Sequence, residues 1–231
     1  MEFEPCQSHN FIFNLNLIAP PQLGVRHWEI GDYARYRHRR KRSVHYDKLD
    51  REIGYHIIGA LEISGDQGYW LKQTGFYYFR TIPRDIYRWV KLHDLRTTRG
   101  GMDYEYLQNY IPFRVEFCEQ SDVPFAKLLK LGEERIETEA GTFECIHYRA
   151  ELTELNREVL EIWVSPAISP LGIVRAQSEN DILELISFGQ NKEITIPKLI
   201  QPVIEGISTL DYGCNSCHGY ETCHESIFPP R

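Results

Sequence analysis

The chain has 231 residues, enough for one large domain or two small ones, and a core of that size needs neither a metal nor disulfides for stability. Hydrophobic residues make up 42% and aromatic residues 13% of the chain, which excludes a disordered protein and favours strands. The net charge of −7 argues against general binding to nucleic acid, because attraction to phosphates requires a positive surface. No run of 18 apolar residues occurs, so no membrane span is predicted.

Residues 1–24 are predicted to form an extended N-terminal arm, apolar in patches and closed by Pro20, Pro21 and Gly24. The arm lacks a basic segment followed by an apolar one, so it is not a signal peptide as it stands. The protein is therefore expected in the cytoplasm, or in the cell envelope or periplasm if a leader has been removed. An apolar arm of this kind can also dock on a neighbouring subunit, which makes self-assembly or a protein partner a second expectation.

The next part of the chain shows alternating patterns that predict strands. Bulky and charged residues alternate over 28–40, and a hairpin is predicted for 51–64 and 68–80 around a turn at 65–68. Short helices are predicted at 86–93, from the spacing of apolar residues, and at 123–131, from a preceding Asp cap and an early proline.

The second half returns to alternating patterns. A hairpin is predicted around Ala140 and Gly141, and three more strands follow within 157–189, the last two joined by a tight turn at Asn180 and Asp181. Seven or eight strands at this spacing predict a mainly β protein with an antiparallel sheet that is strongly curved or nearly closed into a barrel. The sheet domain is expected over 25–200, followed by a Cys/His-rich tail over 201–231.

An ordered set of residues within about 130–190 resembles the last part of DUF3108-like and LolA-like half-barrel domains. The resemblance implies a curved antiparallel sheet wrapped around a helix, in a binding or accessory module of bacterial envelopes, with no catalytic set. The family pattern accounts for neither the N-terminal arm nor the tail. The matching residues are Ala140, Gly141, Thr142, Phe143, Cys145, Trp163, Ser165, Pro166, Gly172 and Val174.

The strongest chemical signal lies in the tail, where Cys214, Cys217 and His218 form a C-x-x-C-H motif. In c-type haem proteins, two thiols at this spacing form thioethers with the porphyrin and the adjoining histidine binds the iron. A distant histidine, from this chain or a neighbouring subunit, would have to supply the sixth ligand. The tail is therefore a candidate for a covalent haem c with His218 as the iron ligand.

Two other interpretations of the tail stay open. A Cys3His zinc site could be formed by Cys214, Cys217 and Cys223 with either His218 or His224. The second cysteine pair of common zinc sites is missing, however. The third interpretation is a plain tail with reduced thiols or a disulfide.

Other signals are weaker. A basic run (Arg35, Arg37, His38, Arg39, Arg40, Lys41 and Arg42) is interpreted as the solvated end of a strand, and acidic residues at 133–139 as the exposed face of another. His38, His45, His56 and His93 are interpreted as structural or surface residues, Cys145 as a buried strand residue, and a metal half-site at His147 is not favoured.

No nucleophile elbow, phosphate-binding loop or dinucleotide fingerprint occurs, so the chain is predicted not to be an enzyme. The leading hypothesis is an accessory or binding protein whose tail carries a haem for electron transfer. The alternatives are a scaffold subunit with a structural zinc tail, and a carrier of a lipid or another hydrophobic ligand in the half-barrel.

Overall fold

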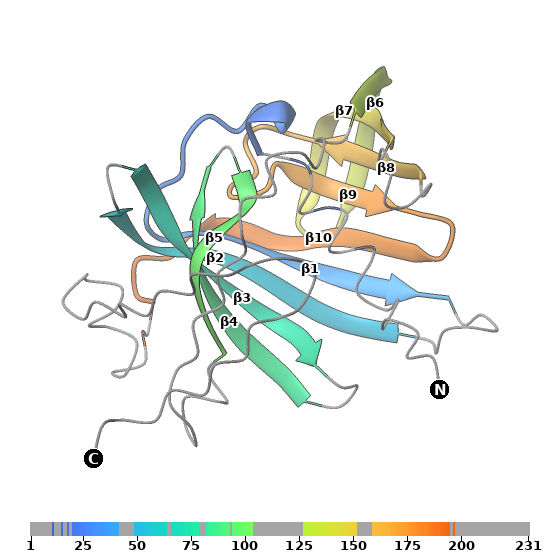
Figure 1. Ribbon diagram of the computed structural model, residues 1–231. Helices are drawn as coiled ribbons and strands as arrows, with labels where there is room; N and C mark the ends of the chain where they lie inside the picture. Colours follow the sequence, from blue (N-terminus) through green and yellow to red (C-terminus); the bar gives the residue numbers. More distant parts are fainter. Residues whose placement is uncertain are drawn as a thin grey trace, which may run out of the picture.

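Ten strands occur among the residues that the computed structural model describes, and they form one antiparallel sheet (Figure 1). The described residues are 11, 15, 18, 20–41, 49–63, 66–78, 82–92, 94–103, 127–151, 159–194 and 196. The strands are β1 (Asp32–Arg40), β2 (Leu49–Ile63), β3 (Asp66–Tyr78), β4 (Ile82–Lys91), β5 (Asp94–Asp103), β6 (Lys127–Thr138), β7 (Gly141–Glu151), β8 (Val159–Val164), β9 (Ile173–Gln177) and β10 (Asp181–Gln190).

The order of the strands in the sheet is β5-β4-β3-β2-β1-β10-β9-β8-β7-β6, so every neighbouring pair except β1 and β10 is also consecutive in the sequence. The pairing of β1 with β10 joins the two halves of the chain at the middle of the sheet, where Tyr36 lies opposite Ile53 on one side and Leu185 on the other. A β-bulge between Arg35 and Tyr36 interrupts the register there, and bulges increase the local bend of a sheet.

The sheet curves so strongly that its edge strand β6 comes close to β9 and β10, with which it does not pair. At the tip of the β6–β7 hairpin, Arg37 of β1 donates to Glu139 at 2.5 Å, and Phe143 contacts Phe188 of β10 edge to face. Figure 1 shows this hairpin standing across the ends of the neighbouring strands. The curved antiparallel half-barrel predicted from the sequence is confirmed.

The concave face of the sheet is filled by the segment that precedes β1. Phe11, Leu15 and Ile18 are each at most 3% exposed and belong to the same core as the strands. A short 3-10 helix, η2 (Pro20–Leu23), follows, and the indole of Trp28 then donates to the carbonyl of Pro170 at 2.8 Å. Phe11 and Leu15 are helical, so the extended conformation predicted for the arm is wrong at these positions. The described part of the N-terminal segment is part of the core of its own chain.

Both helices predicted between the two hairpin regions are wrong where the structure describes them. Residues 86–91 belong to β4, where Trp89 donates from its indole to the carbonyl of Leu61, and a side chain at Gly68 would collide with its ring. Residues 127–131 begin β6, whereas His93 and 123–126 lie outside the described residues. Tertiary packing of large side chains against β3 overrides the helical spacing at β4.

The predicted hairpins are confirmed, with one shift of position. Pairing of Ile63 with Asp66 places the β2–β3 turn between these residues, two positions before the expected one. The β6–β7 turn lies at Glu139 and Ala140, as expected within one residue.

Candidate binding groove

Successive residues of β1 face opposite sides of the sheet, because side chains alternate along a strand. Arg35, Arg37 and Arg39 point outward, whereas His38 and Arg40 are 0% and 6% exposed and point to the concave face. The interpretation of the basic run as a solvated strand end holds for the outward side chains. It is wrong for the two buried ones, which find an acidic partner on β10.

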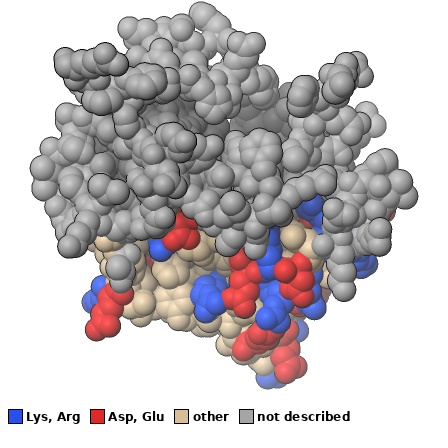
Figure 2. Space-filling model, turned by 90° about the horizontal axis from the view of Figure 1, so that it is seen from below, with Lys and Arg blue, Asp and Glu red and all other residues tan. Residues whose placement is uncertain are grey.

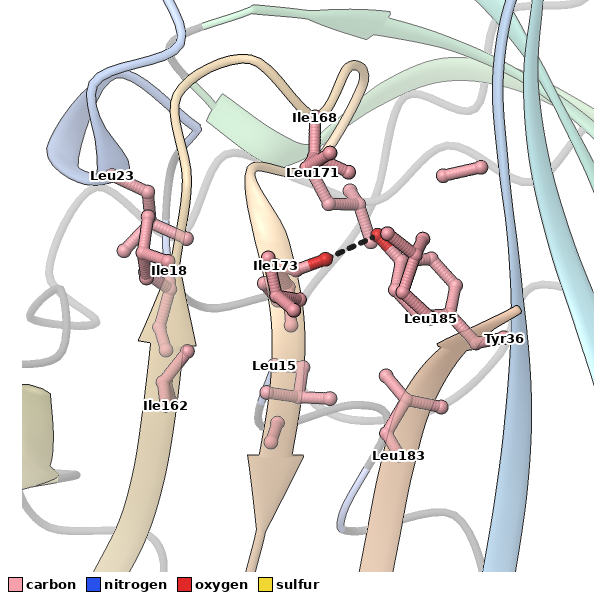
Figure 3. Close-up of a cluster of buried hydrophobic side chains, with 14 of the residues drawn as sticks. Leu15, Ile18, Leu23, Tyr36, Ile162, Ile168, Leu171, Ile173, Leu183 and Leu185 are labelled. Atoms are coloured by element: carbon pink, nitrogen blue, oxygen red, sulfur yellow. Dashed lines mark hydrogen bonds between the residues drawn. The ribbon is translucent and has the colours of Figure 1, made fainter. Parts of the chain in front are cut away.

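Apolar side chains of the core line the concave face of the sheet, and we call this lined face the groove. Leu183 and Leu185 of β10, together with Ile162 of β8, are fully buried there, and Leu15 and Ile18 lie against this apolar wall (Figure 3). Close packing of branched side chains on both sides leaves the groove occupied along this part of its length.

Tyr36 lies at the middle of the groove, and its hydroxyl donates to the carbonyl of Ile173 at 3.1 Å (Figure 3). Burial raises the pKa of Tyr36 well above its ordinary value, and the nearby Tyr55 adds to the effect. Tyr36 is therefore a neutral donor that ties β1 to β9 across the groove.

A polar group interrupts the apolar surface where β1 meets the start of β10. One carboxylate oxygen of Asp181 lies 2.6 Å from Nε2 of His38 and accepts from Nε of Arg40 at 2.8 Å. The ring of Phe11 stacks on the imidazole of His38, with centroids 5.4 Å apart and planes 20° apart. The N-terminal segment therefore covers this polar group.

Burial is the main cause that lowers the pKa of His38, and the guanidinium groups of Arg51 and Arg40 also lower it. The hydrogen bond and the charge of Asp181 act in the opposite direction without overcoming burial. Nδ1 of His38 has no hydrogen-bond partner among the described residues. The imidazole is therefore neutral near pH 7, with one nitrogen engaged by Asp181.

The polar surface continues from β1 onto β2 and β4. Arg51 lies opposite His38 in the register, and both Arg51 and Arg88 lower the pKa of Tyr55, which burial raises. We call the set His38, Arg40, Arg51, Tyr55, Arg88 and Asp181 the polar belt. An apolar groove that ends in a polar belt can hold a ligand with a long apolar part and a polar end.

The outer face of the sheet carries a different kind of polar network. Nδ1 of His147 and the indole of Trp163 share the carboxylate of Glu134, at 2.7 and 2.9 Å, and the two rings stack with centroids 4.3 Å apart. Hydrogen bonds from Trp163 and His147 lower the pKa of Glu134. Glu134 lies on β6, so this contact holds the curled hairpin against β8.

Ion pairs continue this network toward β1. Glu184 accepts from Arg175 at 2.5 Å and also from Arg39, and Arg35 pairs with Glu52. Figure 2 shows acidic and basic side chains close together on one face of the molecule. A shallow hollow of about 460 Å³ lies on the same side of the sheet. It is lined by Tyr33, Arg35, His56, Ser187, Gln190 and Asn191.

The residues predicted to hold a cofactor lie outside the described residues: Cys214, Cys217, His218, Cys223 and His224. His45, His93 and Arg42 also fall outside them. Within the described part, no three His, Cys, Asp or Glu side chains gather as a metal site would require. In that part, too, no helix is long and apolar enough to cross a membrane.

Two smaller expectations are confirmed. Cys145 is buried in β7, at 2% exposure, and burial raises the pKa of its thiol to about 11. Glu133, Glu134, Glu137 and Glu139 are all exposed. The buried pair of His38 and Asp181 was missed, although the alternation of β1 could have marked His38 as inward-facing.

No protein-family model matches the chain, and no curated protein sequence does. The curved sheet is confirmed, whereas membership in the DUF3108-like or LolA-like families stays a prediction.

Several solved structures match the chain at low similarity. A protein from Bacteroides fragilis that is described as exported, with a YmcC-like fold, is 13% identical at a TM-score of 0.38, covering 70% of this chain and 97% of its own. A Parabacteroides distasonis protein described as a lipoprotein is 11% identical at 0.38, covering 75% and 98%. A DUF1329 family protein from Desulfovibrio piger is 9% identical at 0.37, covering 80% and 94%.

Proposed function

We propose that the protein is a non-enzymatic binding protein that holds an apolar chain, such as a lipid or acyl group, on the concave face of its half-barrel. One observation carries the proposal: Phe11, Leu15 and Ile18 lie buried along this face although they belong to no strand of the sheet. The concave face thus accommodates apolar side chains from outside the sheet, and two of them, Phe11 and Leu15, are helical. In the absence of a ligand, the N-terminal segment of the same chain occupies this face.

The size of the competing ligand follows from the strength of this internal contact. Burial of one large apolar side chain stabilises by about 1.5–3 kcal/mol, so three of them hold the segment with roughly 5–9 kcal/mol. Each buried methylene contributes about 0.8 kcal/mol, so a chain of about ten methylenes matches the segment. Single acyl chains of medium or long length are therefore the ligand class that can replace it.

A binding titration of the full chain with a fluorescent fatty-acid analogue tests the proposal. Phe11→Ala combined with Leu15→Ala weakens the internal competitor, so we expect the affinity for the probe to rise about tenfold or more. Leu185→Arg places a charge in the apolar wall and is expected to abolish binding if the variant keeps its circular dichroism spectrum.

Ile30→Ala is the matched control, because Ile30 is an apolar residue outside the groove and is 52% exposed. Its affinity for the probe should equal that of the unmodified chain. The proposed function would be overturned if the probe bound neither the unmodified chain nor the Phe11/Leu15 variant.

For the C-terminal tail we infer a separate role, which is supported by the spacing of Cys214, Cys217 and His218 in the sequence. We propose that the two thiols hold a covalent haem c and that His218 binds its iron, for electron transfer to a docked partner. Covalent attachment of this kind would place the protein in the cell envelope or periplasm. The zinc alternative uses Cys214, Cys217 and Cys223 with His224.

An absorption spectrum of protein purified from its native source, together with metal analysis, tests the tail. A Soret band retained after acid–acetone extraction supports haem, and its loss in Cys217→Ala assigns the attachment. One equivalent of zinc without a Soret band supports the zinc site. The absence of both would overturn the cofactor proposal and leave the groove proposal unaffected.

A further inference from the structure

We infer that the ligand of the groove carries an acidic headgroup, and that the polar belt receives this headgroup where Phe11 now stacks on His38. The inference rests on the proposed function and adds the chemical class of the ligand's polar end. The relevant ligands are single-chain amphiphiles with a carboxylate or a phosphate.

The position of the belt supports this inference. His38 is 0% exposed, and the ring that covers it belongs to Phe11 of the same N-terminal segment that fills the apolar part of the groove. Displacement of the segment therefore uncovers the apolar wall and the imidazole together. A ligand that takes the place of the segment has its chain along Leu183 and Leu185 and its end beside His38.

The charges of the belt select an acidic end over a neutral one. Among the described charged residues that act on His38, two are guanidinium groups, Arg51 and Arg40, and one is the carboxylate of Asp181. Guanidinium groups are suited to planar carboxylates and phosphates, and Arg40 already bonds the carboxylate of Asp181 through Nε. Arg88 extends the positive side of the belt toward Tyr55.

The unpartnered nitrogen of His38 supports a polar ligand as well. Nδ1 is buried without a hydrogen-bond partner among the described residues, although buried polar atoms are normally paired. Because Nε2 donates to Asp181, Nδ1 of the neutral imidazole is an acceptor. A headgroup hydroxyl, such as that of a singly protonated phosphate, donates to it, and an ionised oxygen bonds it only when the imidazole is protonated. When the headgroup is an anion, it also favours protonation of the imidazole, since an opposite charge nearby stabilises the charged form.

Competition against a bound fluorescent fatty-acid analogue tests the inference with three probes of equal chain length: dodecanoic acid, dodecyl phosphate and dodecanol. We expect the affinity of each acidic probe to be at least about tenfold higher than that of the alcohol, because charge-assisted hydrogen bonds are stronger than those of a neutral hydroxyl. The relative affinities of the carboxylate and the phosphate then distinguish a free fatty acid from a phospholipid headgroup as the source.

Arg51→Gln is the informative variant, because it keeps a polar side chain and removes the charge. It should reduce the preference for the acids over dodecanol to about threefold or less. Arg35→Gln is the matched control, since Arg35 points to the outer face and pairs with Glu52 there.

The outcomes separate the two proposals. Equal binding of acids and alcohol by the unmodified chain would overturn the acidic headgroup and leave the groove intact. Binding of none of the three probes would contradict the proposed function itself. The comparison within the unmodified chain decides the inference even if Arg51→Gln does not fold.

Discussion

The two faces of β1 show how one short stretch of sequence serves two environments. On the outer face, Arg37 and Arg39 form ion pairs with acidic residues in water. On the concave face, His38 and Arg40 share a single carboxylate oxygen under a phenyl ring. Ion pairs in water contribute little to stability, whereas a buried charge that loses its partner is strongly destabilising. Ion pairs of the same residue types therefore contribute differently to stability on the two sides of one strand.

The largest effect is expected from Asp181→Ala, which leaves the guanidinium of Arg40 buried without its carboxylate. The free energy of unfolding should fall by about 3–5 kcal/mol, because removal of one partner of a buried ion pair is strongly destabilising. Urea denaturation followed by circular dichroism measures the change. A loss as small as that of an outer-face pair would show that water reaches the belt, and the contrast between the faces would disappear.

A smaller effect is expected from Tyr36→Phe, which removes the hydroxyl that donates to the carbonyl of Ile173. The carbonyl then remains buried without its donor, and this costs about 1–3 kcal/mol. The control is Tyr33→Phe on the opposite face, where Tyr33 is only partly buried and lines the shallow hollow, so the change should be within about 0.5 kcal/mol. Equal losses in the two variants would contradict the assignment of Tyr36 to the dry side.

The pH dependence of stability tests His38 directly. Burial lowers the pKa of His38 below its usual value of 6.5, so the folded state binds a proton less readily than the unfolded chain. The free energy of unfolding should therefore decrease as the pH falls below about 6.5, by at most about 1.4 kcal/mol per pH unit for one proton. At higher pH this contribution is fully present.

His38→Gln provides the matched comparison for this titration, because Asp181, Arg40 and Arg51 stay in place around a side chain that does not titrate. Urea midpoints measured between pH 5 and pH 7.5 should be flatter for this variant. Parallel curves for the two proteins would assign the acid sensitivity to other groups.

The smallest effect is expected on the outer face, in a double-mutant cycle of Arg37→Ala and Glu139→Ala. The two side chains are 36% and 58% exposed, so their coupling should be about 1 kcal/mol or less. Added salt should reduce it further, since exposed pairs are screened. A larger, salt-insensitive coupling would indicate that the β6–β7 hairpin shields this pair from water.

The sequence predicted the curved sheet because alternation of bulky and charged residues repeats along strands such as β1 and β7. It failed at β4, where Trp89 and its neighbours have a spacing compatible with a helix. A strand forms there instead, because Trp89 packs against Gly68 and bonds the carbonyl of Leu61. Both partners are too far away in the sequence to belong to a local pattern. Such partners become visible only when the strands are paired.

The groove was less accessible to prediction than the fold. The arm at 1–24 was recognised as apolar, but its burial within its own chain depends on the curvature of ten strands. The belt depends on the pairing of Arg40 with Asp181, two residues 141 positions apart in the sequence. Alternation along β1 alone indicates only that His38 and Arg40 share one face.

Cys145 has a practical consequence for chemical labelling. Its thiol is 2% exposed and its pKa is raised to about 11, so at neutral pH almost none of it is the thiolate that reacts with alkylating reagents. Iodoacetamide added to the folded protein should therefore leave Cys145 unmodified. Any label taken up under native conditions is attached to another cysteine, and mass spectrometry of the peptides can locate it without mutation of β7.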